Sequence, residues 1–307
     1  MPFDNQKGDK EMAKKKEGIK IGAHQLSWGT SLTQEMIPSR MEEVRGLGCD
    51  AFEVFLSNDS CPCEDINVAA KEADLTTIGC AIIRNGTDGN PLSTDETKRE
   101  KAEQAIHRHV RWTSAIGSSL LAGPLANVLG KPGAQPPTEE ELEAGIRTFG
   151  HVAECASMNG VKVAIEPLQW PEMPWPNTVQ QVLKFIDLVE ELPHVPKGVL
   201  GVLFDIYHAI RAEENWFDAL RMALASRKPL HIHVAGPDRT PPRIGQHIDW
   251  RVIIGELKKA GWKETVTIES FGVECDLPYA VTGPKHRLLP ARDVIATGVK
   301  TLKEAGL

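Results

Sequence analysis

The sequence VKVAIEPL at residues 161–168 joins an apolar, β-branched run to a carboxylate, Glu166, near the point where the run ends. Short runs of this kind are typical of strands that are buried on both faces of a parallel sheet. Three later runs have the same design: GVLGVLFD (198–205), PLHIHVAG (229–236) and ETVTIES (264–270). The second half of the chain therefore predicts four buried strands, each with a polar side chain close to its end.

Four similar runs precede these: IKIGAHQL (19–26), DAFEVFL (50–56), LTTIGCAII (75–83) and SSLLAGPL (118–125). Amphipathic patterns between and after the runs predict helices near 33–47, 64–73, 95–115, 138–158, 178–190, 213–226, 249–260 and 291–304. A doubly wound open sheet usually has fewer strands, and its glycine-rich phosphate turn, GxGxxG, is missing from this sequence. Eight strand-helix units predict one (β/α)₈ TIM barrel, of class α/β, over residues 19–307.

Several predicted helices have residues suited to start them, and we expect N-caps near Ser93, Thr138 and Asn177. Two irregular stretches interrupt the pattern: the proline-rich segment at 129–137 and the longer segment at 271–290. Both follow predicted strands, so we expect them at the barrel mouth as lid material.

The composition is that of an ordinary globular protein. The 307 residues are 41% hydrophobic and 25% charged, and the net charge of −7 offers no general attraction to nucleic acid or anionic membranes. Residues 1–18 are charged and predict a disordered leader, and no segment has the roughly 18 apolar residues that a membrane span requires. The six scattered cysteines indicate reduced thiols, and cytoplasm is the expected compartment.

The polar residues of the last four strands predict a metal site. In a TIM barrel the carboxyl ends of the strands converge at one mouth, so three carboxylates and an imidazole would meet there. Carboxylates crowded together repel one another, whereas a divalent ion neutralises them and uses them as ligands. Such an oxygen-rich set suits Mn²⁺ or Co²⁺, and also Mg²⁺, better than structural zinc. The four residues are Glu166, Asp205, His233 and Glu269.

Taken singly, each of these residues has an ordinary explanation. A glutamate at a strand end is often a solvated loop carboxylate, and a lone histidine can be a core residue. Four such residues at successive strand ends favour the metal site.

Four segments together resemble a known family: IEP (165–167), FDIYH (204–208), HIHV (231–234) and IESF (268–271). They resemble the xylose-isomerase-like TIM barrels and, within them, the ketose 3-epimerases of the tagatose/psicose (allulose) type, over about residues 19–305. The resemblance implies that one divalent ion is bound by the four residues above. It also implies that Glu166 and Glu269 form the acid/base pair that inverts C3 of a ketose through a cis-enediolate.

The resemblance extends to three residues that grip O1 and O2 of the sugar in such epimerases. The corresponding positions are Glu172, His208 and Arg239, at the family's offsets from the metal ligands. The alternative readings are a loop charge for Arg239 and a polar residue at a helix start for His208. Finding all three offsets occupied favours the sugar-binding role.

Three further positions are weaker matches for substrate contacts. Trp28 follows the first strand where the family has an aromatic wall, and Cys80 lies on the third strand where a pocket residue is expected. Core packing explains both equally well. His24 stands where these epimerases tend to have an aromatic residue near the far end of the sugar, so the resemblance fixes the metal chemistry better than the substrate.

Other functions stay open at this point. Inosose or dehydroshikimate-type dehydratases and hydroxypyruvate isomerases share the barrel and a similar ligand set. Apurinic endonucleases need three metals and a DxH motif where this chain has Ile248-Asp249-Trp250, and the negative charge disfavours DNA. A sugar-binding subunit without catalysis is a further alternative, and by resemblance we expect a homodimer or homotetramer.

Overall fold

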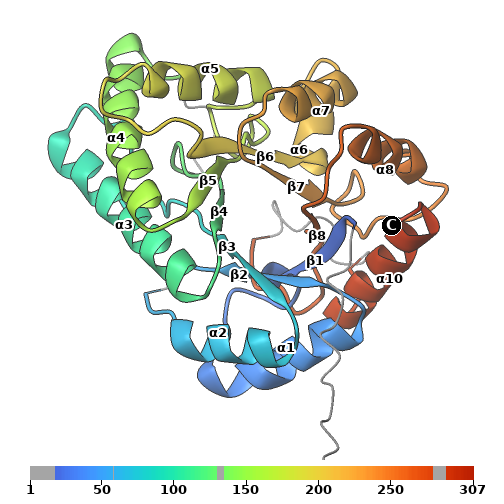
Figure 1. The fold of residues 1–307 in the computed structure, drawn as a ribbon. Helices are drawn as coiled ribbons and strands as arrows, with labels where there is room; N and C mark the ends of the chain where they lie inside the picture. Colours follow the sequence, from blue (N-terminus) through green and yellow to red (C-terminus); the bar gives the residue numbers. More distant parts are fainter. Residues whose placement is uncertain (1–17, 58, 130–134, 279–287) are drawn as a thin grey trace, which may run out of the picture.

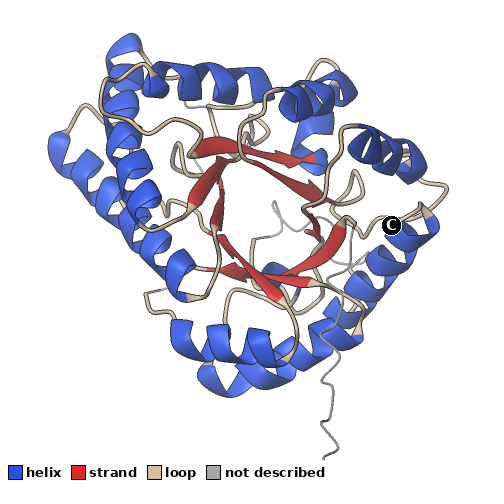
Figure 2. Ribbon diagram, viewed as in Figure 1, coloured by secondary structure: helices blue, strands red, loops and turns tan. Residues whose placement is uncertain are grey.

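The structure, a computed structural model, describes residues 18–57, 59–129, 135–278 and 288–307. The predicted leader, except for Gly18, lies outside these residues, as do 130–134 and 279–287 of the two predicted lid segments. Eight parallel strands close into one barrel in chain order, and helices form a ring around it (Figures 1 and 2). The predicted single (β/α)₈ barrel is confirmed.

The barrel strands are short and buried. They are β1 (Lys20–His24), β2 (Ala51–Phe55), β3 (Thr76–Cys80), β4 (Leu120–Gly123), β5 (Lys162–Ile165), β6 (Leu200–Asp205), β7 (Leu230–Val234) and β8 (Thr265–Ile268). β8 pairs with β1 through the register Val266 to Ile21, which closes the ring. Alternate side chains point inward, so β2 directs Glu53 into the barrel while its neighbour Phe52 packs in the main hydrophobic core.

The helices pack their apolar faces on the outside of the barrel. They are α1 (Ile37–Gly46), α2 (Cys63–Glu72), α3 (Glu96–Ala115), α4 (Glu139–Met158), α5 (Val179–Glu190), α6 (Ile206–Ala212), α7 (Trp216–Ala225), α8 (Trp250–Lys259) and α10 (Ala291–Glu304). Two short 3-10 turns, η1 (Gln25–Ser27) and η2 (Gln34–Met36), follow β1.

Helix starts were predicted with mixed success. Thr138 forms the expected capping box with Glu141 at the start of α4. The expected cap at Asn177 is wrong by one residue: Thr178 caps α5, while the Asn177 side chain donates to the carbonyls of Leu168 and Met173 in the preceding loop. The α3 cap is Asp95 rather than Ser93, because its carboxylate accepts from two backbone N–H groups of the first turn.

One helix was not predicted. α6 begins directly after β6, ahead of the helix that the amphipathic pattern predicted at 213–226. Its N-cap is Asp205, whose Oδ1 accepts from the backbone N–H of Tyr207 at 2.8 Å. At seven residues, α6 is too short to show a helical apolar period, which is why the pattern missed it.

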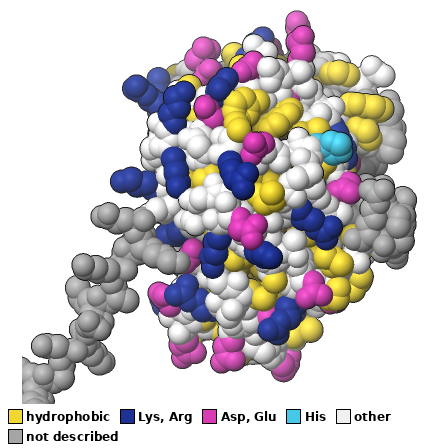
Figure 3. Space-filling view, turned by 90° about the vertical axis from the view of Figure 1, so that its right-hand side faces the viewer, with side chains coloured by type: hydrophobic (Ala, Val, Ile, Leu, Met, Phe, Trp, Pro, Cys, Tyr) yellow, Lys and Arg dark blue, Asp and Glu magenta, His cyan; other side chains and the backbone are white. Residues whose placement is uncertain are grey.

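Among the described residues, the helices lack the combined length and apolar character needed to cross a membrane. On the face shown in Figure 3, positive and negative side chains are interspersed. This distribution agrees with the mixed charge of the sequence.

Candidate metal centre at the carboxyl ends of β5 to β8

The four predicted metal ligands meet at the barrel mouth. Each of Glu166, Asp205, His233 and Glu269 offers one ligand atom, and these atoms all lie within 4.8 Å of one another. All four residues are buried. The geometry therefore brings together the complete set that the strand ends predicted.

The parallel sheet holds the two glutamates although each follows the last residue of its strand. The backbone N–H of Glu166 donates to the carbonyl of Gly123 on β4 at 2.9 Å, and that of Glu269 donates to Val234 on β7 at 3.2 Å. These bonds extend the strand ladders by one residue. The carboxylates are thus directed by rigid backbone rather than by a loop.

Asp205 is fixed in a different way. Its Oδ1 caps α6, which leaves Oδ2 for the site, 3.2 Å from Nη1 of Arg239 and 3.7 Å from Nε2 of His208. Because α6 starts immediately after Asp205, His208 stands one helical turn further on and faces the same cluster. The unpredicted helix therefore sets the relation between a metal-ligand candidate and a sugar-binding candidate.

The predicted trio of sugar-binding residues lies beside the cluster. Nη2 of Arg239 is 2.7 Å from Nε2 of His208, which itself is 3.7 Å from Oε1 of Glu166. Glu172 accepts from the Gln169 side chain at 2.5 Å and lies near enough to Arg239 for the two charges to interact. All three residues therefore border the metal-ligand candidates, and their contact with substrate stays a prediction.

Arg239 is held in a constrained position. Its backbone has a φ of 62°, in the left-handed region, where its N–H donates to Gly236. The guanidinium carbon lies 3.8 Å from the centre of the Tyr207 ring, and Nη1 donates to both Asp205 and Glu269. A buried cation thus balances part of the negative charge of the cluster.

The two glutamates differ in the direction of their pKa shifts. Burial, together with the negative charges of Glu269 and Asp205, raises the pKa of Glu166 well above its ordinary value. Burial also acts to raise the pKa of Glu269, but the charges of His233 and Arg239 outweigh it and hold that pKa well below normal. The pKa of Asp205 is raised to about 7, chiefly by burial. Carboxylates that are crowded together have raised pKa values, and a bound divalent ion would lower those values again.

Glu53 is the site residue that the sequence reasoning missed. It is fully buried on β2, and its carboxylate oxygens lie 2.8 Å from Nε2 of His231 and 2.9 Å from Nε2 of His233. A signal was available, because an ionised residue in the middle of the buried strand Ala51–Phe55 requires buried partners.

The three weaker substrate-contact candidates have different surroundings. His24 is fully buried, with Nε2 directed toward Glu53 at 3.8 Å. Cys80 is buried near Glu53, Glu166 and Glu269, whose charges add to the effect of burial in raising the pKa of its thiol. Trp28 packs against Phe52, with Arg40 of α1 over its ring at 4.3 Å, which is the core-packing arrangement. Their roles toward substrate stay predictions.

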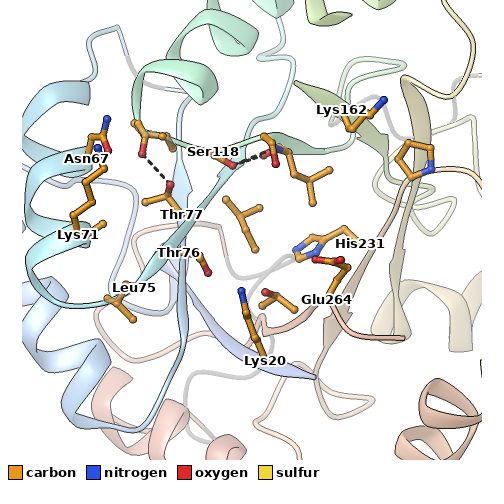
Figure 4. A pocket seen from close by; sticks show the side chains of 18 of the residues that line it. Lys20, Asn67, Lys71, Leu75, Thr76, Thr77, Ser118, Lys162, His231 and Glu264 are labelled. Carbon is orange, nitrogen blue, oxygen red and sulfur yellow. Dashed lines mark hydrogen bonds between the residues drawn. The ribbon is translucent and has the colours of Figure 1, made fainter. Parts of the chain in front are cut away.

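A separate pocket of about 570 Å³ opens at the opposite, amino-terminal end of the barrel. Figure 4 shows Lys20, His231 and Glu264 directed toward its middle. Active sites of TIM barrels lie at the carboxyl ends of the strands, so the metal-ligand cluster, and not this pocket, is the candidate reaction site.

Curated sequence relatives of this chain are named as 3-epimerases. A curated relative from Synechocystis sp. named "Probable ketose 3-epimerase" is 29% identical over 262 residues, which span 83% of this chain and 85% of the relative. An L-ribulose 3-epimerase from Mesorhizobium japonicum is 26% identical, with 83% and 82% of the two chains covered.

Solved structures share the fold. The D-allulose 3-epimerase from Methylomonas sp. superimposes with a TM-score of 0.80 at 20% identity, covering 94% of this chain and 99% of the other. A model of the family described as "Xylose isomerase-like TIM barrel" matches residues 41–305. The chain therefore belongs to the xylose isomerase-like TIM barrel family.

Proposed function

We propose that the protein is a divalent-metal-dependent ketose 3-epimerase. The observation that carries the proposal is the convergence of Glu166, Asp205, His233 and Glu269, whose ligand atoms lie within 4.8 Å of one another at the barrel mouth. Sequence relatives named as ketose and L-ribulose 3-epimerases support it.

The four residues fit a divalent ion in number and chemistry, since three carboxylates and one imidazole are ligands that Mn²⁺, Co²⁺ and Mg²⁺ accept. When bound, such an ion supplies Lewis acidity that stabilises negative charge developing on the oxygens of a ketose. We propose Mn²⁺ or Co²⁺ by resemblance. The homodimer or homotetramer and the cytoplasmic location also stay predictions.

The chain supplies the proton transfers. β5 and β8 stand three places apart in the closed ring, so Glu166 and Glu269 approach the site from different sides. Inversion of C3 requires one base to remove the proton and an acid on the opposite face to return one. This placement suits the glutamate pair to that task, with a cis-enediolate of the sugar between the two transfers.

The neighbouring polar residues would hold the sugar. Arg239 donates hydrogen bonds through a planar guanidinium, and Glu172 and His208 lie around it. Because all three border the ligand cluster, we propose that they grip O1 and O2 while C3 lies between the glutamates.

The test is incubation with D-allulose, D-fructose, D-tagatose and L-ribulose in deuterated water at saturating Mn²⁺. We expect at least one ketose to be converted to its C3 epimer with deuterium at C3. Epimer formation without exchange, or no exchange with any of these sugars, would reject the proposal. Release of water from a keto-polyol substrate would instead favour the dehydratase alternative.

A further inference from the structure

The buried carboxylate of Glu53 contacts both histidines of β7, His231 and His233. Its Oε2 lies 2.8 Å from Nε2 of His231, and its Oε1 lies 2.9 Å from Nε2 of His233. All three side chains are at most 1% exposed, and β2 and β7 are distant in the sequence. Glu53 has no place in the proton transfers proposed above, so its buried charge within the barrel needs another explanation.

The carboxylate determines where the histidines carry their protons. An ionised carboxylate only accepts hydrogen bonds, so Nε2 of His233 must be the protonated nitrogen of the ring. In a neutral imidazole the lone pair then belongs to Nδ1. Nδ1 of His233 lies 3.1 Å from Oε2 of Glu269, inside the ligand cluster.

We propose that Glu53 is a positioning residue of the metal centre: it accepts the Nε2–H of His233 and so directs the Nδ1 lone pair toward the metal ion. The inference rests on the proposed divalent-ion site and deepens it. Metal-binding histidines commonly donate their second ring N–H to a carboxylate, which fixes the ring and its tautomer.

His231 gives Glu53 a fixed orientation. Its Nε2 donates to the second carboxylate oxygen, and the hydroxyl of Thr267 lies 3.3 Å from the same nitrogen. With one oxygen anchored on His231, the other is kept on His233. The first histidine of the HIH sequence thereby acquires a role although it is not among the ligand candidates.

A second cation is the competing explanation, because ligand atoms of His24, Glu53 and His233 also lie within 4.8 Å of one another. The tautomer of His24 argues against it. Nδ1 of His24 accepts from the backbone N–H of Leu26 at 3.1 Å, which leaves the proton on Nε2. His24 therefore presents an N–H rather than a lone pair to Glu53.

The decisive variant is Glu53→Gln, which keeps the shape of the side chain but replaces one acceptor oxygen by an NH₂ donor. One of the two histidines must then turn its ring or move its proton to Nδ1. The matched control is Glu264→Gln, the same substitution at an exposed residue at the other end of the barrel.

Metal-stripped proteins are titrated with Mn²⁺, and free Mn²⁺ is followed by electron paramagnetic resonance. We expect one tight site per chain in the wild type and in the control, and binding about 10- to 100-fold weaker in Glu53→Gln. At saturating Mn²⁺ we expect the KM for the ketose to stay near the wild-type value. A role in folding alone would lower the melting temperature without weakening Mn²⁺ binding.

Folded Glu53→Gln with wild-type Mn²⁺ affinity would overturn the inference, as would two Mn²⁺ ions per wild-type chain with one lost in the variant. If Glu53→Gln does not fold, Glu53→Asp replaces it: the shorter carboxylate should weaken Mn²⁺ binding, and unchanged affinity would contradict the inference. A wild-type chain that binds no Mn²⁺ would instead reject the proposed metal site.

Discussion

Nη1 of Arg239 donates to Oε2 of Glu269 at 2.9 Å, in a place where both side chains are almost completely buried. The same nitrogen reaches Asp205 at 3.2 Å. A residue expected to grip the substrate is therefore also the counter-ion of two metal-ligand candidates. Its removal should affect both sugar binding and the stability of the metal-free protein.

Arg239→Ala should raise the KM for the ketose more than it lowers kcat, when both are measured at saturating metal, because the proposed role of the guanidinium is to bind the sugar and not to transfer a proton. In the metal-free protein the change leaves buried carboxylates without their cation, and we expect a loss of about 3–5 kcal/mol in the free energy of unfolding. Urea denaturation measures this loss. Arg221→Ala, at an exposed surface ion pair, is the control and should alter neither quantity appreciably.

Glu166→Gln and Glu269→Gln should each lower kcat by about 10²- to 10⁴-fold, because each variant removes one of the two groups proposed to move the C3 proton. Initial rates of epimer formation and deuterium exchange at C3 measure the effect. Bound metal is quantified in each variant, so that loss of the ion is separated from loss of the base. Near-normal turnover in either metal-loaded variant would refute the acid/base assignment.

Removal of divalent ions by a chelator should abolish turnover and lower the melting temperature, and addition of Mn²⁺ should restore both. An ion that binds only the folded state stabilises it by about 2.7 kcal/mol when present at 100 times its Kd. Differential scanning calorimetry over a Mn²⁺ series checks this. A melting temperature that does not depend on Mn²⁺ would contradict binding at the four strand ends.

His109 predicts a pH dependence of stability away from the metal centre. Burial on α3, helped by the nearby Arg108 and Arg84 and opposed by Asp88, lowers the pKa of His109 from 6.5 to about 3. Between these values the unfolded chain binds a proton that the folded chain does not. The contribution of His109 to the free energy of unfolding should therefore fall as the pH is lowered through this window, by at most about 1.4 kcal/mol per pH unit.

Urea denaturation of the wild type and of His109→Leu at pH 7, 5 and 4 measures that contribution. Neither ring nitrogen of His109 has a hydrogen-bond partner among the described residues, so leucine removes a polar group without breaking a bond. We expect the variant to lose less stability on acidification. Equal pH dependence in the two proteins would show that His109 titrates normally.

Much of the fold could be predicted because the barrel is encoded locally. Each strand is a short buried run, each helix an amphipathic pattern, and their alternation fixes the topology. The four metal-ligand candidates could be predicted in the same way, because a polar residue at the carboxyl end of a barrel strand lies at the barrel mouth. The sequence reasoning failed for elements too short for a period, such as α6, for caps one residue out of place, such as Thr178, and for the buried site residue Glu53.

The sequence by itself determined the barrel and the four strand-end metal-ligand candidates, because these depend on position within a strand. The sugar-binding candidates beside them followed only from the family resemblance. Only the tertiary structure decided that Glu53 meets His231 and His233 across 178 and 180 residues of sequence. Closure of the ring brings the inward faces of β2 and β7 together. A local sequence pattern does not indicate which inward side chains will then be in contact. In a nearly dry interior a buried charge is stable only beside its partners, so the closed barrel, and not any single strand, determines that contact.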